Sequence, residues 1–297
     1  MTLPGPDYAA PAKLNLFLHV VGRRPDGYHL LQTAFVFLEY GDTLRFRVRE
    51  DGQIKRVNEV EGVTEEQDLI VRAARKLQAR AESRLGADIE VVKRIPMGGG
   101  LGGGSSDAAT TLIVLNHLWK TGLERSELER LGLELGADVP AFIFGRTAWA
   151  EGVGEELQAV DHDGFYALVL TPQAHVPTQE VFTAPDLTRD TNALKMADFS
   201  AGGLLEFCAR QRNDLEPVVL KRSPEVARHL AALEQASQGS LFGRGGRKAR
   251  MTGSGACVFA LFGSESEAEA ALGRLPAGMQ GFVARGLNKH PLFDLAR

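Results

Sequence analysis

A run of glycines in the first half of the chain constrains the fold more than any other feature. Residues 94–109 read RIPMGGGLGGGSSDAA, so six glycines fall within seven residues that only Leu101 interrupts. Glycine adopts positive φ angles readily and lets the backbone approach a ligand, because no Cβ atom stands in the way. The run therefore predicts a place where bare backbone comes close to another group.

The segments on either side of the glycines suggest what that group is. Residues 87–95 (ADIEVVKRI) predict a strand, and residues 106–119 (SDAATTLIVLNHLW) predict a helix. A strand, a glycine-rich loop and a helix in this order form an anion site, since successive N–H groups and the positive end of the helix dipole converge. Ser105 and Ser106 add hydroxyl groups there. A flexible linker is the alternative, but linkers do not usually separate a buried strand from an apolar helix, so phosphate binding is favoured.

The pattern of the glycines excludes one phosphate loop and weakens another. The P-loop motif ends in Gly-Lys-Ser/Thr, whereas here Gly104 is followed directly by Ser105. The dinucleotide motif GxGxxG is met by Gly98, Gly100 and Gly103, but that fold also needs an acidic residue after the next strand. The region that follows, LNHLWKTGLERSEL, predicts a helix, a turn and a helix. An NAD(P)-binding oxidoreductase is therefore a distant second interpretation.

Length, charge and cysteine content limit the class of protein. The chain has 297 residues, which favours two domains, and a formal net charge of −4, which argues against a nucleic-acid or membrane-surface partner. Cys208 and Cys257 lie far apart in no metal-binding spacing, and we expect two buried thiols in a reducing compartment. The first 13 residues lack a secretory pattern, and no stretch approaches the roughly 18 apolar residues of a membrane span. We therefore expect a cytoplasmic protein.

Strand and helix patterns alternate irregularly along the chain. Strands are predicted at residues 14–21, 33–40, 43–50, 87–95, 141–150, 165–170, 257–263 and 281–287. Helices are predicted to begin at Thr64, Ser126, Ser223 and Ser264, from their capping patterns, and near Ala201. The first half is rich in strands before its helices begin, which favours an α+β fold over a doubly wound sheet. A boundary near residue 160 divides the chain into domains 1–160 and 161–297.

Two further stretches place charged residues beside apolar ones. Residues 11–18 (PAKLNLFL) put Lys13 and Asn15 on one face of an otherwise apolar strand, by its period of two. Residues 136–142 (GADVPAF) put Asp138 between a glycine and a proline. A strand-end lysine reaching water and an ordinary turn aspartate are the plain alternatives, and neither stretch decides between them alone.

Taken together, PAKLNLFL, DGYHLLQT, PMGGGLGGGSSDAA, GADVP and TGSGACVFA resemble the GHMP family of small-molecule kinases. The resemblance runs from about residue 10 to residue 292. It implies an N-terminal domain like the second domain of ribosomal protein S5, a ferredoxin-like C-terminal domain, and the use of ATP and Mg²⁺. PAKLNLFL, DGYHLLQT and EGVGE are similar to those members that phosphorylate the 2-hydroxyl of a cytidine-diphosphate sugar alcohol. A mevalonate- or homoserine-type kinase is the near alternative, and a non-catalytic RNA-binding protein is a remote one.

The resemblance also implies roles for individual residues. Asp138 is expected to be the catalytic base, because a carboxylate can accept the proton of an attacking alcohol, and Lys13 to be its charged neighbour. The implied ATP-binding residues are Lys93, Pro96, Met97, Gly98, Gly99, Gly100, Leu101, Gly102, Gly103, Gly104, Ser105 and Ser106, the last being also a candidate Mg²⁺ ligand. The implied substrate-binding residues are Asn15, Tyr28, His29, Thr178 and Phe182.

Stacking explains the aromatic members of that set. A cytosine ring fits between aromatic faces, so Tyr28 and Phe182 are expected to enclose it while His29 contacts its edge. From spacing alone, Tyr28 and Phe182 would be ordinary half-buried aromatics, and the DGYH context favours the binding role. Asp68 departs from the family pattern, which has an asparagine there, and an aspartate lacks the amide donor. The basic stretch 239–250 predicts a solvated surface loop.

Overall fold

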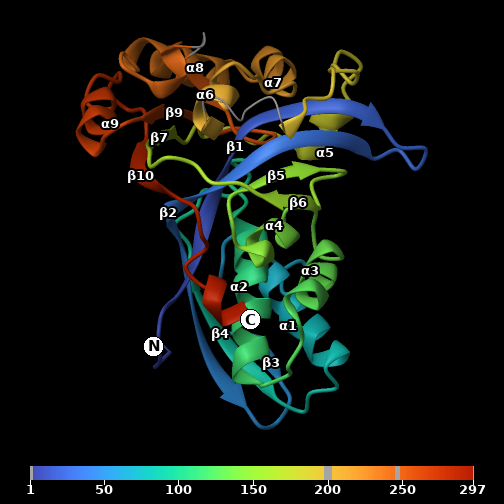
Figure 1. Cartoon of the computed structure of the whole chain (residues 1–297). Coiled ribbons are helices and arrows are strands. Elements are labelled where there is room, and N and C mark those ends of the chain that lie inside the picture. The colour runs from blue at the N-terminus through green and yellow to red at the C-terminus, as the bar shows by residue number, and fades with distance from the viewer. Residues whose placement is uncertain (1–2, 197–202, 245–247, 297) are drawn as a thin grey trace.

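The computed structural model describes residues 3–196, 203–244 and 248–296 (Figure 1). Within them, the strands follow the order β3–β4–β2–β10–β7–β9–β8, with β1 beside β2, and β5 paired with both β2 and β6. The strands are β1 (Tyr8–Arg23), β2 (His29–Arg49), β3 (Ile54–Arg56), β4 (Gly86–Val92), β5 (Ala148–Glu151), β6 (Glu156–Ala159), β7 (Tyr166–Leu170), β8 (Ala249–Met251), β9 (Val258–Phe262) and β10 (Gly281–Leu287). The helices are α1 (Leu69–Arg80), α2 (Gly103–Leu118), α3 (Arg125–Leu133), α4 (Val139–Phe144), α5 (Thr178–Phe182), α6 (Gly203–Ala209), α7 (Glu216–Arg222), α8 (Pro224–Ala236) and α9 (Glu265–Leu272), with short 3-10 turns at Leu241–Arg244 and Phe293–Ala296. None of the helices found in these residues is long and apolar enough to cross a membrane.

The long antiparallel pair of β1 and β2 runs through both halves of the molecule. Figure 1 shows it rising from the region of α1–α4 to the region of α6–α9. The two strands predicted at 33–40 and 43–50 are a single strand of 21 residues. The reason is steric, because a Cβ atom on Gly41 would lie 2.2 Å from the carbonyl oxygen of Ala10 on the neighbouring strand. The glycine thus lets the ladder continue where the sequence suggested a turn.

The first half of the chain packs its helices against one face of this sheet. Leu44 and Phe46 of β2, Ile89 of β4, Leu112 of α2 and Phe142 of α4 belong to one buried cluster. Burial of each such side chain contributes about 1.5–3 kcal/mol to folding. The middle of α2 is buried on every side, which makes it the central helix of this half. Its first residues, which follow the glycine run, are thereby held by the core.

Strand β10 joins the two halves of the chain. Residues 281–285 pair with β7, whereas Gly286 and Leu287 pair with β2. The chain then returns to the first half, where Leu292 and Leu295 pack against the first core cluster. In the second half, α8 and α9 lie against β7, β9 and β10. The division at residue 160 stays a prediction.

The strand predicted at 141–150 is wrong in its first part. Residues 139–144 form α4, and only Ala148–Glu151 form a strand, β5. Pro140 lies in the first turn of α4, where its missing N–H costs nothing, and Gly145 ends the helix with φ 71°. A short apolar run does not distinguish a buried strand from a buried helix. Asp138 consequently lies at the start of a helix.

Two predicted helix starts are also wrong, and two are confirmed. The helix predicted from Thr64 begins at Leu69, and the one predicted from Ser126 is capped by Glu124. Ser223 caps α8 and Ser264 caps α9 as predicted. The helix start predicted near Ala201 lies outside the described residues.

The predicted surface loop at 239–250 is wrong in part: Leu241–Arg244 form a 3-10 turn, Ala249 and Arg250 belong to β8, and Phe242, Ala249 and Arg250 are buried. Arg250 is only 3% exposed, and its guanidinium donates to the carbonyl oxygens of Leu16 and Cys208, each at 2.7 Å. It also lies 4.1 Å from the ring centroid of Phe242. Arg250 therefore ties the second half to β1. Cys208 and Cys257 are buried thiols as predicted, and burial raises the pKa of each to about 12.

Candidate active site

A cavity of about 990 Å³ brings most of the predicted site residues together. Its walls come from β1, β2, the glycine loop, the starts of α2 and α4, helix α5 and a second glycine turn at 252–255. The predicted residues that line it are Lys13, Asn15, Tyr28, His29, Lys93, Pro96, Met97, Gly98, Gly99, Gly100, Gly102, Gly103, Gly104, Ser105, Asp138, Thr178 and Phe182. Leu101 and Ser106 are buried behind this lining.

The glycine loop (residues 96–105) needs glycine for both conformation and space. Gly98, Gly100 and Gly102 have φ angles of 70°, 76° and 74°. A Cβ atom on Gly100 would lie 2.3 Å from the carbonyl oxygen of Thr252. The N–H groups of residues 103–105 lie in the first turn of α2, where they have no partner within the helix. Bare backbone and free N–H groups at the mouth of a helix suit the phosphates of a nucleotide.

A second glycine turn supports the first. The N–H of Cys257 donates to the carbonyl oxygen of Gly99 at 3.1 Å. The Thr252 hydroxyl donates to the carbonyl oxygen of Gly100 at 3.5 Å. The Asn213 amide donates to the carbonyl oxygens of Met251 and Gly253 at 2.9 and 2.8 Å. These contacts give the glycine loop a fixed floor contributed by the second half of the chain.

Lys93 lies between two buried carboxylates that the sequence analysis missed. Its Nζ donates to Asp107 Oδ2 at 2.7 Å and to Asp42, which also accepts the N–H groups of Arg94 and Ile95. Burial lowers the pKa of Lys93, but Asp107 and Asp42 outweigh that effect and raise it. Burial raises the pKa of Asp107 to about 7, although Lys93 opposes the change. The cluster fastens the end of β4 to the start of α2, directly beneath the glycine loop.

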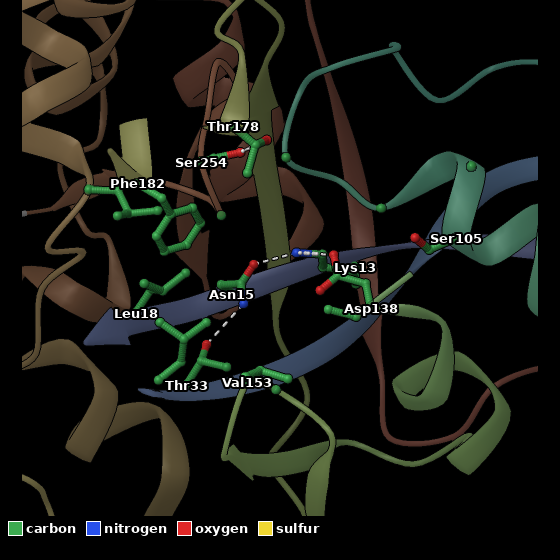
Figure 2. Close-up of a pocket in the computed structure, with 18 of the residues that line it drawn as sticks. Lys13, Asn15, Leu18, Thr33, Ser105, Asp138, Val153, Thr178, Phe182 and Ser254 are labelled. Carbon is green, nitrogen blue, oxygen red and sulfur yellow. Dashed lines mark hydrogen bonds and ion pairs between the residues drawn. The ribbon is translucent and has the colours of Figure 1, made fainter. Parts of the chain in front are cut away.

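Lys13 and Asp138 form an ion pair at the middle of the cavity. Lys13 Nζ lies 3.2 Å from Asp138 Oδ2; the lysine side chain is 5% exposed and that of the aspartate 37%. The ammonium also donates to Asn15 Oδ1 and lies 5.3 Å from the ring centroid of Phe35. The N–H of Lys13 donates to the carbonyl oxygen of Leu101 at 3.0 Å, which links β1 to the glycine loop. Figure 2 shows the two charged groups facing one another at the cavity wall.

Hydrogen bonds on three sides fix the orientation of Asn15. Its side-chain amide donates to Thr33 Oγ1 at 3.0 Å, and the Thr33 hydroxyl donates to the carbonyl oxygen of Phe17. Its backbone N–H donates to Thr252 Oγ1 at 2.9 Å. The oxygen of the amide is thereby turned toward Lys13 (Figure 2). The sequence analysis missed Thr33 and Phe35, although the period of two along β2 places both on one sheet face, which Asn15 shares as the cross-strand partner of Phe35.

The far end of the cavity is lined by aromatic rings. Tyr28, in the turn between β1 and β2, is 64% exposed. The rings of His29 and Phe182 have centroids 5.1 Å apart and are tilted by 32°. Figure 2 shows Phe182 across the cavity from Asn15. The hydroxyls of Thr178 and Ser254 lie 2.7 Å apart and connect α5 to the second glycine turn.

Asp68 has a structural use that accounts for its carboxylate. It caps α1 by accepting the N–H of Ile70 at 2.8 Å, and it pairs with Arg56. It is buried and does not line the cavity. An asparagine could cap the helix equally well but could not form the ion pair. The carboxylate of Asp68 therefore serves a partner within the first half of the chain, Arg56.

The described residues include no cluster of three or more His, Cys, Asp or Glu side chains able to hold a metal ion. The Ser106 hydroxyl is buried with no hydrogen-bond partner among the described residues, whereas Ser105 lines the cavity. A metal-binding role for Ser106 stays a prediction that this placement does not favour.

Family models match both halves of the chain. Residues 68–146 match the GHMP kinases N terminal domain, and residues 200–281 match the GHMP kinases C terminal domain. The chain therefore belongs to the GHMP kinase family, and the predicted α+β, two-domain GHMP kinase fold is confirmed.

Individual relatives narrow the likeness further. The 4-diphosphocytidyl-2-C-methyl-D-erythritol kinase of Thiobacillus denitrificans is 58% identical over 287 residues, which cover 97% of each chain. A crystal structure of 4-(cytidine 5'-diphospho)-2C-methyl-D-erythritol kinase has a TM-score of 0.78 and 32% identity, covering 94% of this chain and 98% of the other. The homoserine kinase of Cytophaga hutchinsonii has a TM-score of 0.68 but 18% identity, over 96% and 94% of the two chains, and so shows the fold alone.

Proposed function

We propose that this protein transfers the terminal phosphoryl group of ATP to the 2-hydroxyl of 4-diphosphocytidyl-2-C-methyl-D-erythritol, with Mg²⁺, in the non-mevalonate route to isoprenoid precursors. One observation carries the proposal. A single cavity joins a glycine loop suited to phosphates, a carboxylate beside a buried lysine, and a group of aromatic rings. The names of relatives that are 51–58% identical support the choice of substrate. A cytoplasmic location is part of the same proposal.

Asp138 accepts the proton of the attacking hydroxyl in this proposal. Its side chain is the more exposed member of the pair with Lys13, so it can reach a ligand in the cavity. The Lys13 ammonium is held by Asn15 as well as by Asp138, and so remains in place when the proton moves. A fixed positive charge beside the base stabilises charge that develops on the alcohol oxygen.

The glycine loop positions the nucleotide. Phosphoryl transfer depends mainly on positioning and on neutralising the charge of the phosphates. N–H groups at the start of α2 supply part of that neutralisation, because the loop contains no lysine. Mg²⁺ bound with ATP would supply the rest by drawing charge from the phosphate oxygens. Of the adjacent residues Ser105 and Ser106, it is Ser105 that lines the cavity.

The aromatic end holds the cytidine group. Tyr28 and Phe182 stack against the pyrimidine ring, and His29 contacts its edge. Asn15 lies between Phe182 and the Lys13–Asp138 pair, and Thr178 lines the cavity beside Ser254. Both residues can there contact the diphosphate and the sugar alcohol. A cavity of about 990 Å³ has room for both substrates at its two ends.

A coupled assay for ADP tests the proposal. With ATP and Mg²⁺, we expect turnover with 4-diphosphocytidyl-2-C-methyl-D-erythritol and at most one hundredth of that kcat/KM with mevalonate or homoserine. Removing Mg²⁺ with a chelator should stop the reaction. Comparable turnover of either smaller alcohol would contradict the proposed substrate while leaving the kinase assignment in place.

A further inference from the structure

Arg189, which does not line the cavity, connects both sides of its aromatic end. Its Nε donates to His29 Nε2 at 3.1 Å. Its terminal nitrogens donate to the carbonyl oxygens of Phe182, Ala184 and Leu187 at 3.0, 2.6 and 3.0 Å. One guanidinium therefore joins the first residue of β2 to the last residue of α5. The two rings that meet at 5.1 Å, His29 and Phe182, share this one support.

The direction of the contact with His29 has a chemical consequence. A guanidinium group donates hydrogen bonds and cannot accept them. His29 Nε2 must therefore be the acceptor, and the proton of the neutral ring must reside on Nδ1. No hydrogen bond joins Nδ1 to any of the residues that the structure describes. That nitrogen is thus a hydrogen-bond donor of fixed position on a residue that lines the cavity.

We propose that Arg189 is a positioning residue for pyrimidine recognition, which holds His29 neutral with its proton on Nδ1 and so makes it a donor to an acceptor on the base edge. The inference rests on the proposed function, which supplies the cytosine. Cytosine presents an acceptor at N3, where uracil presents an N–H donor. A donor that cannot change direction distinguishes the two bases, because an N–H group facing another N–H group leaves both unpaired.

The charges around His29 agree with a neutral ring. Burial lowers the pKa of His29, and Arg189 and Arg23 lower it further. Arg23, on β1, donates to the carbonyl oxygen of Gly27 at 3.0 Å and makes no hydrogen bond to His29. Asp26, in the turn before His29, accepts from Arg24 at 2.7 Å. The cations from β1 and from the segment after α5 thus both oppose protonation of the ring.

Nitrogen-15 NMR of the imidazole groups in the ligand-free protein tests the first step independently of the substrate. A His29→Gln variant identifies the signal among the seven histidines. We expect His29 to carry its proton on Nδ1 and to have a pKa below 6.5. Arg189→Met should produce a mixture of both tautomers and a higher pKa. Arg23→Met, the matched control, should raise the pKa but leave the tautomer unchanged. A wild-type signal with the proton on Nε2 would overturn the inference whatever the substrate is.

Calorimetric titration with CDP, UDP and ADP tests the second step. Wild type should bind CDP at least tenfold more tightly than UDP, and Arg189→Met should lose most of that preference while its affinity for ADP changes less than twofold. An unchanged preference in Arg189→Met would overturn the inference and leave the proposed function standing. A wild type that does not bind CDP would overturn the proposed function, and the inference with it.

Discussion

The two ends of the cavity are built from different parts of the polypeptide. At the nucleotide end the main chain forms the wall: Gly98, Gly100 and Gly102 have positive φ angles, and at Gly100 neighbouring backbone leaves no room for a Cβ atom. At the cytidine end side chains form the wall, with Tyr28, His29 and Phe182 contributed by segments about 150 residues apart. The first end therefore depends on backbone conformation and on close contact with the second glycine turn, whereas the second depends on aromatic side chains that the fold brings together.

Substitutions at the two ends should therefore differ in whether they affect folding stability as well as ligand affinity. The glycine loop is fastened to Cys257, Thr252 and Lys13, so a change there disturbs packing as well as binding. Tyr28 is 64% exposed, so its removal costs the fold little. We therefore expect substitutions at the nucleotide end to lower both stability and affinity, and those at the cytidine end to lower affinity alone.

Asp138→Asn should have the largest effect, because Asp138 belongs to neither end. An asparagine of the same shape cannot accept the proton of the hydroxyl, so we expect kcat to fall by about 10²–10⁴. Affinity for ADP and CDP should change less than threefold, as measured by calorimetry. Asp161→Asn, an exposed carboxylate paired with Arg146, is the control and should retain full kcat. An Asp138→Asn enzyme with wild-type kcat would show that another group is the base.

Gly100→Ala should have the next largest effect and tests the nucleotide end. Its Cβ atom would lie 2.3 Å from the Thr252 carbonyl oxygen, at a φ of 76° that other residues adopt at a cost of about 1–3 kcal/mol. We expect a lower melting temperature and at least tenfold weaker binding of ADP. In the control Gly104→Ala, the nearest atom would be 3.4 Å away at Leu69, so stability should be nearly unchanged. Equal stability of the two variants would show that the loop rearranges freely.

Tyr28→Ala tests the cytidine end. Loss of one stacking face costs about 1–3 kcal/mol, so we expect KM for the cytidine substrate to rise about tenfold to a hundredfold. The melting temperature and KM for ATP should remain at wild-type values, since the side chain is mostly exposed. Tyr28→Phe is the control and should retain wild-type KM. If Tyr28→Ala also weakened ATP binding, the two ends would not be independent.

The sequence predicted a strand, a glycine loop and a helix in the order in which β4, residues 96–105 and α2 occur, because the signals for these elements are local. The caps of α8 and α9 likewise depend on residues three positions apart. The partners of Lys93 could not be found in this way, because Asp42 lies 51 positions earlier. Arg250 looked like a surface residue for the same reason, since the carbonyl groups that hold it come from distant segments.

The buried charges beneath the glycine loop are expected to affect stability rather than catalysis. Asp107 has a pKa of about 7 in the folded protein, against about 3.9 in an unfolded chain. Between these values the unfolded state releases the proton and the folded state keeps it, so this group's contribution to stability is full below pH 4 and is lost as the pH rises to 7. In the Asp107→Asn variant the side chain at this position cannot ionise, so its stability should not fall in this way. The fall in wild type amounts to at most about 1.4 kcal/mol per pH unit.

Urea unfolding of wild type and Asp107→Asn at pH 5 and pH 7 measures that difference directly. As the pH rises, the free energy of unfolding of the variant should increase relative to that of wild type. Asp51→Asn is the control, because hydrogen bonds from Arg49 lower the pKa of Asp51 to about 2, so it stays ionised in both states over this range. A constant difference between wild type and Asp107→Asn would mean that Lys93 holds Asp107 ionised throughout. The nucleotide end would then rest on a permanent charge cluster, whereas the charged groups of the cytidine end lie near the surface.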